Sequence, residues 1–181
     1  MTSLYPQSYL DYLVQFHVER DYFECHEILE EYWKSAPPHE RKPVWVGLIQ
    51  IAVGLYHQRR GNMSGAIKML TSALALVNEH QSDIRQLGLD STALNTLLVQ
   101  RLEEMKQGKA YHSLSLPVAD SALQQAYEQA CLNKNSAKDN VSNMEDVYLL
   151  NKHTLRDRSD VYAERNRQLQ IRQERRKSQP D

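Results

Sequence analysis

Glycine and proline are both scarce in this sequence of 181 residues, which contains six of each. In an average globular protein the two residues together make up about 12% of the chain, so their share here is about half the usual one. Because turn-rich β folds need many such residues, this scarcity favours helices. We therefore expect an all-α protein.

Cysteine is nearly absent, and long apolar runs are missing. The two cysteines, Cys25 and Cys131, are too few for a disulfide framework and fit a reducing compartment. No stretch approaches the roughly 20 apolar residues that span a bilayer, and the first residues lack the basic and apolar regions of a signal peptide. We expect a cytoplasmic protein that does not contact a membrane.

Hydrophobic residues recur at the 3–4 spacing of helices throughout residues 1–132. Short connections between such helices favour antiparallel neighbours, so we predict an antiparallel bundle of about five to six helices. The third helix is apolar on nearly all sides, which predicts a central position. The expected helices cover about 6–19, 22–33, 43–60, 63–77, 91–105 and 117–131.

The sequence changes character after residue 132. Residues 133–147 contain little to bury and are predicted to be a linker. Residues 148–181 are predicted to form a basic helical extension with one thin apolar stripe, whose members recur every seven residues. Because so narrow a stripe cannot fold alone, we expect it to dock on the body or on another subunit, which favours a homo-oligomer. The stripe consists of Tyr148, Leu155, Tyr162 and Leu169.

Charge is distributed unevenly, although the formal net charge is only −1. Residues 1–151 carry 13 basic and 18 acidic side chains, whereas residues 152–181 carry nine basic and five acidic ones. A basic tail on an acidic body favours either contact with the body or an anionic partner. We expect Arg158, Arg165 and Arg172 to bind that partner. Interleaved acidic residues favour a protein as this partner, with a nucleic acid as the less favoured alternative.

The second predicted helix, DYFECHEILEEYW, contains the side chains best suited to a chemical function. At about 100° per residue, His26 and Glu30 fall among large apolar side chains on one face, which we expect to be the core side. A buried imidazole and carboxylate are costly unless they are paired. The third helix offers partners, because Gln50 and His57 interrupt its apolar wall. The pattern thus predicts a buried polar network of four side chains.

Two interpretations of this network remain open. In the first, His26, Glu30 and His57 bind a divalent metal such as zinc, and Glu27 serves as the general base of a metal-dependent hydrolase. In the second, the same side chains fix helix register through hydrogen bonds, with Gln50 as a supporting member. The protein would then be a non-catalytic helical interaction module whose basic C-terminal helix binds a partner.

Three segments within about residues 16–80 carry a resemblance to a known family. The segments FHVERDYFECHEILEEYWK, WVGLIQIAVGLYH and GNMSGAIKML resemble family 309 of the domains of unknown function. The C-terminal third, including KHTLRDRSDVYAER, is similar to longer bacillus-type members of that family. The resemblance implies an all-α bundle and no established activity. Some members carry the label of predicted metal-dependent hydrolases, which implies a role for the residues that match here, His26, Glu27, Glu30 and His57.

Overall fold

The computed structural model describes residues 3–135, 141–155 and 159–177, and the chain divides into two compact units, residues 1–150 and 151–181. Within these described ranges every regular element is a helix, apart from an isolated β-bridge between Leu89 and Val118. The expected all-α class and helical bundle are therefore confirmed. No helix in these ranges is long and apolar enough to cross a membrane.

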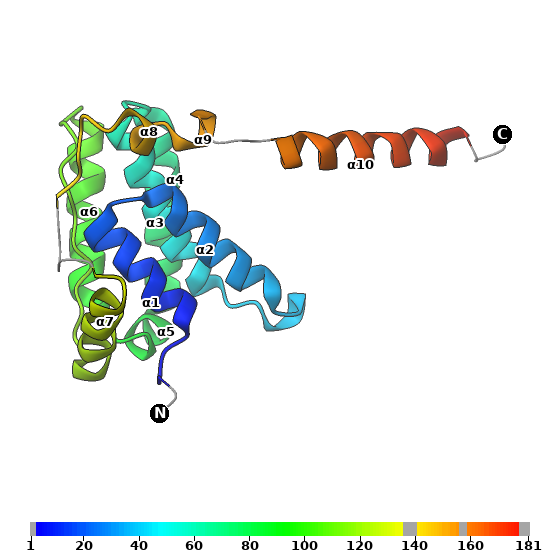
Figure 1. Cartoon of the computed structure of the whole chain (residues 1–181). Coiled ribbons are helices and arrows are strands. Elements are labelled where there is room, and N and C mark those ends of the chain that lie inside the picture. The colour runs from blue at the N-terminus through cyan, green and yellow to red at the C-terminus, as the bar shows by residue number, and fades with distance from the viewer. Residues whose placement is uncertain (1–2, 136–140, 156–158, 178–181) are drawn as a thin grey trace. The chain divides into compact units, whose positions relative to one another are not determined.

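The first unit contains most of the helices (Figure 1). Five of the six predicted helices match α1, α2, α3, α4 and α6 closely, whereas the short α5 was not predicted. In order, the elements are α1 (Gln7–Val14), a π-helical turn (Gln15–Glu19), α2 (Tyr22–Ser35), a 3-10 turn (Pro38–Glu40), α3 (Pro43–Arg59), α4 (Met63–Glu79), α5 (Gln81–Gln86), α6 (Ser91–Lys106), α7 (Ser121–Asn133) and α8 (Val147–Leu150).

Side-chain caps determine where four of these helices begin. Asp21, Asn62, Asp90 and Asp120 each accept a hydrogen bond from the backbone amide three residues further on. Helix α7 consequently begins after Asp120, whereas the sequence pattern predicts a start at Pro117. Pro117 lies in an irregular segment, where its carbonyl accepts a hydrogen bond from the Asp90 amide.

Helix α3 is the central helix of the first unit, as its apolar composition predicts. It packs against both α2 and α4, and 12 of its 17 residues are buried. At Gly54 the two backbones come close, because a Cβ atom there would lie 3.5 Å from the Ala66 carbonyl oxygen of α4. A methyl group would fit there in ordinary contact, whereas a larger side chain would push the two helices apart.

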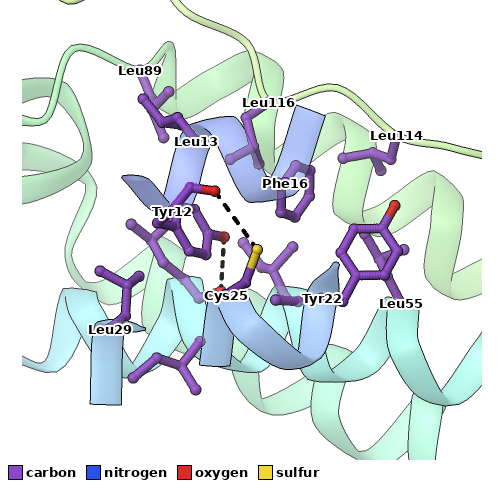
Figure 2. Packing of buried hydrophobic residues seen from close by; sticks show 14 of the residues in the cluster. Tyr12, Leu13, Phe16, Tyr22, Cys25, Leu29, Leu55, Leu89, Leu114 and Leu116 are labelled. Atoms are coloured by element: carbon purple, nitrogen blue, oxygen red, sulfur yellow. Dashed lines mark hydrogen bonds between the residues drawn. The ribbon is translucent and has the colours of Figure 1, made fainter. Parts of the chain in front are cut away.

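Helix α2 turns a different face to the core from the one we predicted. Tyr22, Cys25 and Leu29 are fully buried, and Cys25 faces Tyr12 of α1, with its sulfur 3.6 Å from the Tyr12 carbonyl oxygen (Figure 2). The small thiol lets α1 approach at this point. His26 lies beside this core stripe and not within it. Burial raises the pKa of the Cys25 thiol well above its ordinary value, so Cys25 is a packing residue.

The second unit contains α9 (Lys152–Leu155) and α10 (Ser159–Lys177). Side chains 163–174 of α10 are exposed except for the half-buried Ile171. Arg165 and Arg172, two of the predicted partner-binding residues, are among the exposed ones, and Arg158 lies outside the described residues. Within the described part of α10, no apolar face is fully buried.

Candidate functional site

The α2–α3 face is the half-buried surface along the line where these two helices pack. Two ring contacts define their antiparallel register, Phe23 with Tyr56 at 6.0 Å between centroids and Tyr32 with Trp45 at 5.1 Å. This register places Gln50 level with the middle of α2. We define the face by its half-buried residues Phe23, His26, Glu30 and Trp33 of α2 and Val46, Gln50, Val53 and His57 of α3.

A chain of ion pairs runs along α2 at the centre of this face. His26 Nε2 lies 2.9 Å from Glu30 Oε2, and the other Glu30 oxygen lies 2.6 Å from Lys34 Nζ. The hydrogen bond from Lys34, with the nearby His26, holds the pKa of Glu30 below its ordinary value. The side chains of His26 and Glu30 remain 28% and 34% exposed. These pairs, four residues apart, are typical of a helix surface.

The other residues of the predicted site have different surroundings. Glu27 Oε1 lies 3.4 Å from His26 Nδ1, without the geometry of a hydrogen bond. His57 Nδ1 lies 3.2 Å from the Asn62 side-chain nitrogen at the end of α3, and burial, together with the charge of Arg60, lowers the pKa of His57. In the described part of the chain, no group of three His, Cys, Asp or Glu residues is arranged to hold a metal ion.

Three polar atoms of the α2–α3 face are buried and have no hydrogen-bond partner. They are His26 Nδ1, Trp33 Nε1 and Gln50 Oε1. Each such atom costs about 1–3 kcal/mol, and folded proteins retain few of them. The indole of Trp33 can only donate, whereas the side-chain oxygen of Gln50 can only accept. The face therefore contains one donor and one acceptor that the chain itself leaves unsatisfied.

A second polar cluster surrounds Arg59 in the last turn of α3. We call Arg20, Tyr22, Arg59, Tyr111, Ser113 and Ser142 the arginine–tyrosine cluster. Arg59 is 5% exposed, and its guanidinium carbon lies 4.6 Å from the ring centre of Tyr22 and 5.8 Å from that of Tyr111. Such cation–π contacts contribute roughly 0.5–2 kcal/mol each. They hold the guanidinium against two aromatic rings.

Within the described ranges, the oxygen atoms that accept hydrogen bonds from Arg59 are all neutral. Its Nη1 donates to the carbonyl of Arg20 at 2.6 Å and to Ser142 Oγ at 3.2 Å, and its Nη2 donates to the carbonyl of Leu149 at 3.4 Å. Its Nε is buried and has no hydrogen-bond partner. Among the residues that the structure describes, no carboxylate lies within ion-pair distance of Arg59.

The hydroxyl groups of the cluster form a continuous chain. Tyr22 Oη lies 2.6 Å from Tyr111 Oη, which lies 2.6 Å from Ser142 Oγ. The Ser142 amide donates to Ser113 Oγ at 3.0 Å. Burial raises the pKa of Tyr22 well above its ordinary value, so its phenol stays neutral and does not balance the charge of Arg59.

The sequence patterns did not reveal this cluster, although one signal for it exists. Arg59 continues the buried stripe of Leu48, Ala52 and Leu55 along α3, a position that predicts burial for an arginine. Tyr111 and Ser142 come from distant segments, and no spacing rule connects them to α3.

A pocket of about 260 Å³ lies beside another buried arginine, Arg101 of α6. Arg101 Nε lies 3.2 Å from Glu104 Oε2, and its Nη1 donates to Gln58 Oε1 at 3.2 Å. His112 Nε2 lies 2.9 Å from the same Glu104 oxygen, and its Nδ1 lies 3.0 Å from Arg101 Nη2 and 3.3 Å from the Ser113 carbonyl oxygen. The histidine therefore contacts a carboxylate, a guanidinium and a carbonyl, and this arrangement does not activate a serine hydroxyl.

Residues 9–69 match the family described as Domain of unknown function (DUF309). The chain is also 43% identical over 169 residues to the uncharacterized protein YpuF of Bacillus subtilis (strain 168), an alignment that covers 93% of this chain and 97% of that protein. No solved structure matches the chain. The family match contains the whole α2–α3 face and Arg59, but neither Tyr111 nor Ser142.

Proposed function

This chain belongs to the DUF309 family, whose description gives no function, and we propose that it is a non-catalytic helical interaction module. This proposal rests on the hydrogen bonding of the polar groups on the α2–α3 face. Its charged groups are already paired within α2, whereas the Trp33 donor and the Gln50 acceptor have no hydrogen-bond partner. A face of this kind gains hydrogen bonds when a second protein surface covers it.

The chemistry of the α2–α3 face favours a second copy of this chain as its occupant. In a two-fold dimer the same patch meets itself, so each contact occurs twice. Trp33 of one copy can donate to Gln50 of the other, and the reciprocal bond forms with it. In the observed register Gln50 is level with about residue 28 of α2. The pairing is therefore centred near Glu30, and a dimer centred there also brings Glu27 opposite Lys34.

Helix α10 is the second element of the proposed module. A helix that is polar on nearly all sides gains little stability from its own packing and typically becomes ordered on a partner. Glu164 and Glu174 alternate with arginines such as Arg165 and Arg172, which favours an acidic protein surface over a nucleic acid. A dimer carries two copies of α10, so a partner with two sites would bind with increased avidity.

The oligomeric state of the full chain tests this proposal. Sedimentation velocity over a range of concentrations is expected to show a dimer for the wild type and a monomer for Val53→Lys, at the centre of the face. Val99→Lys on α6 is the matched control, because Val99 is exposed outside the face, and this variant is expected to remain dimeric. Trp33→Phe, which removes only the indole donor and part of the ring, is expected to weaken the dimer. A monomeric wild type, or a dimeric Val53→Lys, contradicts the proposal.

A metal-dependent hydrolase, with His26, Glu30 and His57 as ligands and Glu27 as base, is the rival proposal. The 2.9 Å approach of His26 Nε2 to Glu30 Oε2 supports it, since both atoms are suitable donors to a divalent cation. Elemental mass spectrometry on protein purified without a tag or chelator separates the two. A stoichiometric metal ion that is lost in both His26→Ala and His57→Ala favours the hydrolase. Its absence from the wild type favours the module.

A further inference from the structure

The arginine–tyrosine cluster has the composition of an anion-binding site. We propose that the Arg59 guanidinium and the Tyr22 and Tyr111 phenols of this cluster bind the phosphate group of a small molecule, and that residues 141–150, which include Ser142, close over this site and compete with the ligand. We call residues 141–150 the strap. This site is independent of the α2–α3 face and of the dimer proposed above.

The charge at Arg59 is the first reason. A guanidinium enclosed away from water is unfavourable unless an anion or well-placed acceptors compensate it. Here its acceptors are all neutral, and the buried Nε has none. A phosphate oxygen pair can bind an arginine through two parallel hydrogen bonds, which supplies both the missing charge and the missing acceptor.

The hydroxyl groups around Arg59 are the second reason, because they favour a phosphate over a carboxylate. Tyr111 Oη is within hydrogen-bond distance of both Tyr22 Oη and Ser142 Oγ. A hydroxyl hydrogen rotates to suit its partner, so these groups can donate to an anion as readily as to one another. A tetrahedral phosphate has oxygens for the guanidinium and others for the phenols, whereas a planar carboxylate has only two.

The attachment of the strap is the third reason. It contacts the cluster through polar groups, the Ser142 hydroxyl and amide and the Leu149 carbonyl. Its large apolar side chains at Val141, Met144 and Val147 are exposed. Displacement of the strap therefore sacrifices a few hydrogen bonds and the partial burial of Leu149 and Leu150. The Leu149 carbonyl is bonded to Nη2, which forms one edge of the guanidinium together with Nε, so this carbonyl occupies the place that a phosphate oxygen would take.

Calorimetric titration of the full chain with inorganic phosphate, at fixed ionic strength set with chloride, tests the site. The wild type is expected to bind phosphate saturably. Arg59→Lys keeps the charge but loses the two-pronged geometry, and it is expected to bind at least about tenfold more weakly. Arg60→Lys is the matched control, because Arg60 is the neighbouring arginine and also lies over a tyrosine ring, and its affinity is expected to equal that of the wild type.

Two further measurements keep the proposal testable if Arg59→Lys does not fold. Ser142→Ala removes a hydroxyl that holds the strap against Arg59 and Tyr111, so this variant is expected to bind phosphate more tightly. Phosphate is also expected to accelerate hydrogen exchange of backbone amides in the strap of the wild type, because the strap is displaced. No saturable binding, equal affinity in a folded Arg59→Lys, or unchanged exchange in the strap on binding overturns the proposal.

Discussion

The α2–α3 face and the arginine–tyrosine cluster both place charged side chains on the central helix pair, yet their charges are compensated in opposite ways. On the face, Glu30 contacts His26 on one side and the Lys34 ammonium on the other, and it stays partly exposed to water. In the cluster, Arg59 is enclosed and meets only neutral oxygens. Paired charges on a surface contribute little, whereas an enclosed and unbalanced charge is costly. In this chain, the charged group with the larger expected energetic cost is therefore Arg59, whereas the sequence patterns point to His26 and Glu30.

The largest expected effect tests whether His26 belongs to the surface of α2 and Leu29 to its core. Leu29→Ala is expected to lower the free energy of unfolding by about 3 kcal/mol, because it leaves a cavity in a fully buried site. His26→Ala is expected to cost only about 0.5 kcal/mol, the loss of one exposed pair. Urea denaturation of both variants measures the difference. Equal losses would show that the α2–α3 face acts as core.

The second prediction concerns the hydroxyl chain of the cluster. Tyr111→Phe is expected to lower the free energy of unfolding by about 1 kcal/mol, because it leaves the Tyr22 and Ser142 hydroxyls without their shared partner. Tyr32→Phe is the control on the α2 side, where the ring packs against Trp45. Chemical denaturation of this control is expected to match the wild type. A Tyr111→Phe protein of unchanged stability would show that the chain contributes nothing.

The smallest effect lies on the face and depends on pH. Lys34 and His26 lower the pKa of Glu30 in the folded protein, so the paired carboxylate stabilises the fold at pH values above its unfolded pKa of about 4.3. Glu30→Gln is expected to cost about 0.3 kcal/mol at neutral pH. This cost should disappear as the pH falls through the lowered pKa. Thermal unfolding between acid and neutral pH measures it, with the exposed Glu31→Gln as control. A cost that persists in acid would rule out the ion pairs as its source.

Local signals predicted most of the helices of this protein. Asp21, Asn62 and Asp90 begin helices by accepting a hydrogen bond from an amide three residues further on, and the spacing of His26 and Glu30 predicts their contact. These interactions join residues no more than four apart, so sequence spacing contains them.

The rotation of α2 and the position of the arginine–tyrosine cluster could not be predicted in the same way. Aromatic residues lie on both sides of α2, so its pattern fits more than one core face, and the contact of Cys25 with α1 decides between them. Arg59 contacts Tyr111, which follows α6 in the chain, and Ser142, which follows α7. Such contacts depend on the tertiary path, which periodicity does not record.

The position of α1 against α7 has a consequence for synthesis of the chain. The His17 ring, at the end of the first helical segment, accepts a hydrogen bond from the Leu116 amide at 2.9 Å and packs against Tyr127. At about 5–20 residues per second, a ribosome adds the intervening segment in roughly 5 to 25 seconds. The residues that cover the aromatic surface of the N-terminal helix are therefore synthesised only after most of the first unit has been made. During that interval the aromatic surface around His17 is exposed on the nascent chain, which is the kind of surface through which partly folded chains aggregate.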